Sequence, residues 1–138
     1  MTLVIDSSAL IAMFTGEQQA DECFDLASRA PELLMSAGTW LETEIVIELR
    51  RSRALTRGWA AFQEDLLLTL VDVTARQARI ARDAYRDFGK GTGHPAGLNF
   101  GDCFAYALAK DRRLPLLAVG DDFRHTDLHV VPQKHVVP

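Results

Sequence analysis

Five acidic residues stand where the sequence changes from an apolar run or a turn to a predicted helix. Each one either follows an apolar run typical of a buried strand or lies in the first turn of a predicted helix. Carboxylates that share a site repel one another unless a cation holds them charged. Mg²⁺ and Mn²⁺ bind such oxygen ligands, so these acids indicate divalent-cation chemistry. They are Asp6, Glu42, Asp102, Asp121 and Asp122.

Each acid also has a structural interpretation. Glu42 completes a capping box that begins at Thr39, and Asp102 is the third residue after Asn99. Such a cap contributes about 1 kcal/mol, and Asp6 and Asp121 suit turns. The sequence alone leaves both interpretations open for any one acid, whereas the whole set favours a cation site. No arrangement of histidines or cysteines indicates zinc, because the histidines have no close partners: His94, His125, His129 and His135.

The elements around these acids alternate between strands and helices. Strands are predicted at 2–5, 33–35, 70–73, 116–119 and 129–131. Helices are predicted at 9–14, 17–29, from a turn at 36–39 to about Arg53, around 59–66, from Thr74 to about Asp87, and at 100–113. The helix after 36–39 carries apolar Leu41, Ile45, Ile47 and Leu49, and the glycines and proline of 89–97 predict a mobile loop.

Unbroken apolar strands that alternate with helices indicate an α/β fold, a three-layer α/β/α sandwich with a mainly parallel sheet. In such sheets ligands bind beyond the carboxyl ends of the strands. Asp6 and the pair Asp121-Asp122 follow strands in this way, and the helix acids Glu42 and Asp102 are expected at the same rim.

Length and composition fit one domain over residues 1–138, with 48% hydrophobic and 25% charged residues. The net charge of −4 excludes a broadly basic nucleic-acid-binding surface. Arginines cluster around Arg50 and Arg51 and recur at helical spacing from Arg76 to Arg86, as expected of a solvated face or of contact with a polyanion.

Cys23 and Cys103 lack disulfide or zinc spacing and suit a reducing cytoplasm. No run is long enough for a membrane helix.

Four ordered segments resemble a PIN domain of the VapC toxin family over essentially the whole chain. They are Val4-Ile5-Asp6-Ser7-Ser8-Ala9-Leu10, the helix with Glu42, Asn99-Phe100-Gly101-Asp102-Cys103-Phe104-Ala105-Tyr106-Ala107, and Leu117-Ala118-Val119-Gly120-Asp121-Asp122-Phe123 with Thr126-Asp127-Leu128. The resemblance implies a Mg²⁺- or Mn²⁺-dependent endoribonuclease, the toxin of a toxin–antitoxin pair. It also implies a homodimer that a VapB-type antitoxin silences.

By position, Asp6, Glu42 and Asp102 match the first three acids of that family. The fourth acid is less clear, and the resemblance favours Asp122 with Asp121 as the alternative. Ser7 or Ser8 resembles the small hydroxyl residue that supports the metal site.

On this hypothesis Asp6 and Asp102 ligate the ion, while Glu42 and Asp122 complete the site through waters or orient the attacking water. Hydrolysis of the RNA phosphodiester would leave a 3′-hydroxyl and a 5′-phosphate. Because an acidic site repels RNA, basic residues must bind it. The candidates are Arg50, Arg51, Arg53, Lys90 and Arg124.

Rival functions share the acidic rim of an α/β fold. Aspartyl-phosphate phosphatases carry Asp-x-Asp after the first strand, but Ser8 occupies the second of these positions. A receiver domain should carry its acceptor after the third strand, where Val73 leads to Thr74. A non-catalytic regulatory or binding domain is the remaining alternative.

Overall fold

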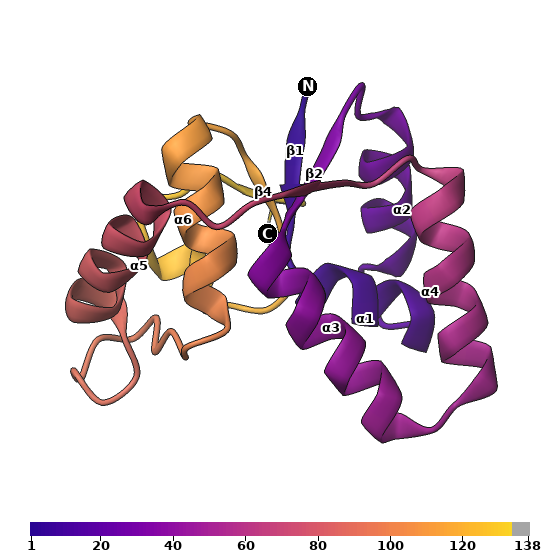
Figure 1. The fold of residues 1–138 in the computed structure, drawn as a ribbon, viewed down its shortest axis with the longest axis horizontal. Coiled ribbons are helices and arrows are strands. Elements are labelled where there is room, and N and C mark those ends of the chain that lie inside the picture. Colours follow the sequence, from indigo (N-terminus) through magenta and orange to yellow (C-terminus); the bar gives the residue numbers. More distant parts are fainter. Residues whose placement is uncertain (134–138) are drawn as a thin grey trace, which may run out of the picture.

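The computed structural model describes residues 1–133 and shows one parallel β-sheet between two layers of helices (Figure 1). The strand order is β3-β2-β1-β4-β5, and every neighbouring pair is parallel. This confirms the predicted three-layer α/β fold. The strands are β1 (Leu3–Ile5), β2 (Leu33–Ser36), β3 (Thr69–Val71), β4 (Leu116–Leu117) and β5 (Val130–Val131).

Helices cover the two faces of the sheet in separate groups, as the two sides of Figure 1 show. One group comprises α1 (Ser7–Thr15), α2 (Ala20–Arg29), α3 (Ala37–Arg50) and α4 (Arg53–Asp65). The other comprises α5 (Ala75–Phe88) and α6 (Asp102–Arg112), and a short 3₁₀ helix, η1 (Phe123–His125), follows β4. None of the helices in residues 1–133 is long and apolar enough to cross a bilayer.

The strands divide their side chains between two cores. Leu3 and Ile5 of β1 pack with α1 to α4, whereas Val4 between them packs with α5 and α6. Leu34 of β2 likewise faces the second core while its two neighbours face the first. Successive side chains of a strand point to opposite faces, and helices cover both faces at β1, so all three residues of β1 are apolar and buried.

Helix starts were predicted well where one polar residue precedes the helix. The Thr74 hydroxyl accepts a 3.0 Å hydrogen bond from the Gln77 amide at the start of α5. The Asn99 side chain accepts from the Asp102 amide at 2.9 Å, and the Asp102 carboxylate accepts from the Asn99 amide at 3.0 Å. Asn99 thus bonds the first helical amide as predicted of a cap, but the regular helix begins at Asp102 and not at Phe100, and the residue at its N-cap position is Gly101.

The predicted boundaries of α3 are wrong at both ends. The helix begins at Ala37, and the Ser36 hydroxyl accepts from the Gly38 amide at 3.2 Å, so the capping box at Thr39 does not form. It ends at Arg50, because Arg51 adopts a left-handed conformation with φ of 49°. Ser52 then caps α4.

Only part of the apolar pattern of α3 is buried. Ile47 lies in the core, whereas Leu41, Ile45 and Leu49 are 56%, 51% and 75% exposed. These three residues, spaced four apart, form one row along the helix, which we call the α3 apolar row.

Candidate active site

Asp6 is a buried carboxylate at the end of β1. Asp6 is 3% exposed. Its Oδ2 accepts a 3.0 Å hydrogen bond from the Ser8 amide, so Asp6 caps α1. Burial raises the pKa of Asp6, hydrogen bonds from Ser8 oppose that rise, and the charge of Glu42 adds to it. The chain thus places a carboxylate in an environment that disfavours its charge.

Ser8 and Ser7 support two different acids. The Ser8 hydroxyl oxygen accepts a 3.2 Å hydrogen bond from the Val119 amide, and the same side chain is hydrogen-bonded to Asp6. The Ser7 side chain is hydrogen-bonded to Glu42 and lowers its pKa. Each serine is thus hydrogen-bonded to a different acid, and a supporting role of Ser7 or Ser8 at a metal site stays a prediction.

Glu42 reaches the site from the second turn of α3. Burial raises the pKa of its carboxyl group, and the charge of Asp102 raises it further. A glutamate in the second turn does not serve as a cap, because the capping positions lie in the first turn. The capping interpretation of Glu42 is therefore excluded.

Asp102 is the first residue of α6. Burial raises its pKa to about 6; the hydrogen bond from the Asn99 amide opposes this shift, and the charges of Asp6 and Asp122 add to it. Asp102 is therefore hydrogen-bonded to the turn before α6 and also interacts electrostatically with Asp6 and Asp122. Its role as a cation ligand stays a prediction.

The electrostatic interactions connect four acids from four parts of the chain. Asp6 interacts with Glu42, Glu42 with Asp102, and Asp102 with both Asp6 and Asp122. We call Asp6, Glu42, Asp102 and Asp122 the acidic cluster. Within residues 1–133, no group of three or more acid, histidine or cysteine side chains is close enough to surround one ion.

The adjacent acids Asp121 and Asp122 follow β4 and are both exposed. Asp122 directly precedes η1, and its charge raises the pKa of Asp102. Asp121 accepts the Arg124 amide with its backbone carbonyl at 3.1 Å.

The basic residues expected to bind RNA lie around the molecule and not inside the acidic cluster. Arg50 ends α3 and Arg51 directly follows the helix. At about 1.5 Å of rise per residue, Arg50 lies about 12 Å along the helix axis from Glu42. Lys90 is exposed in the loop after α5. The Arg124 guanidinium donates to the backbone carbonyls of Gly120 and Pro132, at 3.1 and 2.7 Å.

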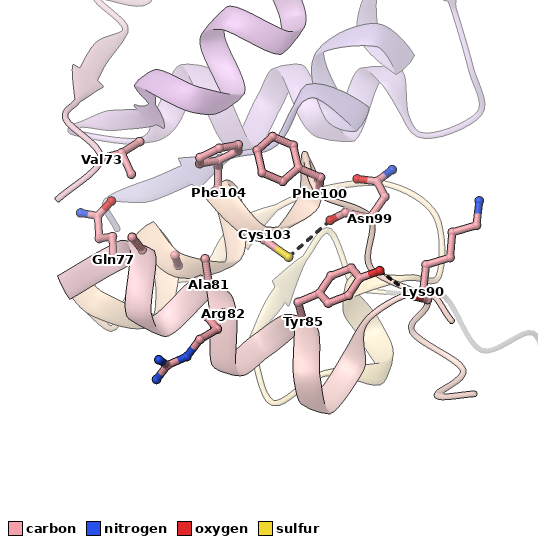
Figure 2. A pocket seen from close by; sticks show the side chains of 12 residues that line it. Val73, Gln77, Ala81, Arg82, Tyr85, Lys90, Asn99, Phe100, Cys103 and Phe104 are labelled. Atoms are coloured by element: carbon pink, nitrogen blue, oxygen red, sulfur yellow. Dashed lines mark hydrogen bonds between the residues drawn. The ribbon is translucent and has the colours of Figure 1, made fainter. Parts of the chain in front are cut away.

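A pocket of about 580 Å³ opens between α5 and α6 beside the site, without containing any of the four acids. Figure 2 shows Phe100, Cys103 and Phe104 of the α6 region facing Gln77 and Tyr85 of α5 across it. Cys103 and Cys23 are buried free thiols, and burial raises the pKa of each to about 11, so neither supplies a reactive thiolate.

Sequence reasoning missed Gly101. The Glu42 carboxylate lies directly against it, so a Cβ atom at position 101 would overlap that group. The signal available in the sequence is a glycine directly before a candidate metal ligand at the start of a helix, where no turn requires one.

Comparison with known proteins identifies the family. Residues 3–128 match the family model for the PIN domain. The chain is 47% identical over 124 residues to VapC ribonuclease Mb0625 of Mycobacterium bovis, covering 90% of this chain and 93% of that protein. It is also 47% identical over 130 residues to ribonuclease VapC30 of Mycobacterium tuberculosis, covering 94% and 98%.

Solved structures share the fold at lower identity. VapC20 of Mycobacterium tuberculosis, described as a toxin that cleaves the sarcin-ricin loop, superposes with a TM-score of 0.67 at 20% identity over 91% of this chain and 95% of that one. A toxin–antitoxin complex from Klebsiella pneumoniae gives a TM-score of 0.70 at 19% identity over 96% and 99%. With the family match and the close relatives, these findings show that the chain belongs to the PIN domain family and, within it, to the VapC ribonucleases.

Proposed function

We propose that this protein is a metal-dependent endoribonuclease that acts as the toxin of a toxin–antitoxin pair. The observation that carries the proposal is the acidic cluster, in which carboxylates from β1, α3, α6 and the turn after β4 influence one another's ionisation. Relatives at 47% identity over nine-tenths of the chain are named ribonucleases, which supports the same activity.

The donor set of the cluster suits Mg²⁺ or Mn²⁺. These ions take oxygen ligands, and Mg²⁺ is commonly held by one or two carboxylates and completed by waters and substrate phosphates. Asp6 and Asp102 are the pair proposed to hold the ion, since the charge of Asp6 raises the pKa of Asp102 and the charge of Glu42 raises the pKa of Asp6. When bound, such an ion activates water and neutralises charge on the phosphate.

The other two acids of the cluster serve the reaction through position. Glu42, which is hydrogen-bonded to Ser7, and the exposed Asp122 would orient water and would complete the ion site through water when an ion is bound. Attack by water in line with the leaving oxygen produces a 3′-hydroxyl and a 5′-phosphate, whereas a cyclic phosphate product would contradict this route.

Binding of RNA requires positive charge near an acidic site, because a polyanion is repelled by unpaired carboxylates. Arg50, Arg51, Lys90 and Arg124 are the residues proposed to contact phosphates. Arg124 lies in η1, two residues after Asp122. Its guanidinium is held by a hydrogen bond to the Gly120 carbonyl.

The decisive experiment measures RNA cleavage by purified protein with Mg²⁺ or Mn²⁺ and with EDTA. Asp6→Asn and Asp102→Asn should each lower kcat at least about 100-fold, since each removes a charge from the proposed ion site. Asp25→Asn is the matched control, because Asp25 is an exposed acid of α2 paired with Arg29 at 3.1 Å. Wild-type rates in both site variants, or undiminished cleavage in EDTA, would overturn the proposal.

We also propose a VapB-type antitoxin as the partner, acting in the cytoplasm where RNA substrates are present. A basic side chain of such a partner placed in the acidic cluster would inhibit by charge and by occlusion. Co-expression followed by cleavage assays tests this, with an antitoxin stripped of basic residues in its inhibitory segment. Full inhibition by the stripped form would contradict the electrostatic part of the proposal.

A homodimer is proposed on the α3 apolar row. Leu41, Ile45 and Leu49 are each more than half exposed and lie one turn apart. Side chains four residues apart form a ridge along a helix, and this ridge can pack into the groove beside the same ridge of a second copy of the protein. The two copies are then related by a twofold axis.

A further inference from the structure

Gly101 has an ordinary helical backbone, so its conformation does not explain why it is glycine. Its φ of −63° and ψ of −39° lie in the region that every L-residue adopts readily. The residues whose backbone does favour glycine are elsewhere, for example Gly97 with φ of +56°. The reason for glycine at position 101 must therefore come from its surroundings.

Those surroundings are the carboxylate of Glu42. A Cβ atom built on Gly101 would overlap Oε2 and Cδ of Glu42 and would lie 2.7 Å from Oε1. All three atoms of the carboxylate group thus occupy the space that a side chain at position 101 would need. Gly101 itself is buried, so this space is not open solvent.

Glycines on other helices face apolar side chains, whereas Gly101 faces a carboxylate. Gly58 of α4 faces the Phe14 ring at 3.2 Å, and Gly38 of α3 faces the Phe104 ring. Both of those neighbours are apolar rings whose movement changes packing. At position 101 the atoms that would have to move belong to a charged member of the acidic cluster.

We propose that Gly101 is a positioning residue for Glu42 and sets how closely that carboxylate approaches Asp102. The proposal rests on the proposed ribonuclease function and names a further determinant of the same site. Asp102 is the next residue along the chain, so displacement of Glu42 from Gly101 moves it relative to the proposed ion ligand. A displacement of about 1 Å in an active site can cost about 100-fold in rate.

The first test is Gly101→Ala in RNA cleavage with Mn²⁺, measured as kcat and KM separately and across pH. We expect kcat to fall about 10- to 100-fold with KM changed less than about threefold, because Glu42 takes part in the reaction more than in RNA binding. Gly58→Ala, a helical glycine in another contact, is the matched control and should retain the wild-type kcat.

A double-mutant cycle separates positioning from general damage. In a Glu42→Ala background the carboxylate is gone, so adding Gly101→Ala should lower single-turnover cleavage by less than about twofold. An equal fall in both backgrounds would overturn the proposal, as would a wild-type kcat for Gly101→Ala alone.

Thermal unfolding provides a readout that is independent of catalysis. Gly101→Ala should lower the melting temperature of the otherwise wild-type protein through overlap with Glu42. In the Glu42→Ala background it should raise that temperature, because alanine replaces glycine in helical backbone with the space free. A lowered temperature in both backgrounds would refute the positioning role. Should the wild type fail to cleave RNA with Mg²⁺ or Mn²⁺, the proposed function fails, while this thermal cycle still decides the steric relationship.

Discussion

The Val119 amide donates a 3.2 Å hydrogen bond to the Ser8 hydroxyl oxygen, joining residues 111 positions apart in the chain. The bond links the carboxyl ends of β4 and β1, which are paired in the centre of the sheet. Because Ser8 is also hydrogen-bonded to Asp6, the position of that buried acid depends on the end of β4.

Ser8→Ala should destabilise the fold by about 1 to 2 kcal/mol, since it leaves the Val119 amide without its acceptor. It should also shift the acidic limb of the pH–rate profile to higher pH, because the Ser8 side chain lowers the pKa of Asp6 and its loss raises that pKa. Urea unfolding and a pH series of cleavage rates measure the two effects. Ser28→Ala on the exposed face of α2 is the control, and equal behaviour of the two variants would contradict the role of Ser8.

Asp102→Asn should stabilise the metal-free protein at neutral pH by on the order of 1 kcal/mol. The native pKa of Asp102 is about 6 against an ordinary 3.8, so the folded state binds the proton more tightly. Stability of the wild type therefore falls as pH rises from about 3.8 to 6 and stays lower above that interval. Asparagine can still accept the Asn99 amide.

Denaturation curves at pH 3.5 and pH 7.5 measure this effect. The gain from Asp102→Asn should be present at the higher pH and largely absent at the lower one. A variant less stable than the wild type at pH 7.5 would show that repulsion and burial do not dominate at Asp102.

Mn²⁺ should raise the melting temperature of the wild type in a concentration-dependent manner and EDTA should reverse the rise. An ion that binds only the folded state stabilises it by RT ln(1 + [L]/Kd), about 2.7 kcal/mol at 100 times Kd. The Asp6→Asn/Asp102→Asn double variant should show little of this rise. Equal stabilisation of the double variant would place metal binding elsewhere on the protein.

Ile45→Glu should shift the protein from dimer to monomer, because it puts a charge in the middle of the α3 apolar row. Light scattering after size-exclusion chromatography measures the mass across a range of concentrations. Glu48→Gln, on an exposed residue of the same helix, is the control. A monomeric wild type, or a dimer unaffected by Ile45→Glu, would contradict the proposed interface.

Local signals in the sequence were enough for much of the site. The strand before Asp6 and the hydrogen bond from the Asp102 amide to the Asn99 side chain depend on short-range features, and both form as expected. The start of α3 was misplaced because Ser36 and Thr39 are both suitable caps. The parallel pairing of Ser36 with Val71 keeps β2 extended through Ser36, and the helix begins directly after it.

Contacts between distant elements could not be predicted in this way. The reason for glycine at position 101 is the Glu42 carboxylate on another helix, which no local pattern reveals. The same holds for the α3 apolar row, since helical periodicity predicts a face without saying what covers it.

The sheet order also constrains when the acidic cluster can assemble. β1 lies between β2 and β4, so β1 completes its pairing only when β4, which lies far later in the chain, has been synthesised. Asp122 and the amide that anchors Ser8 arrive with that same late segment. A chain that stops before this late segment therefore lacks an assembled acidic cluster.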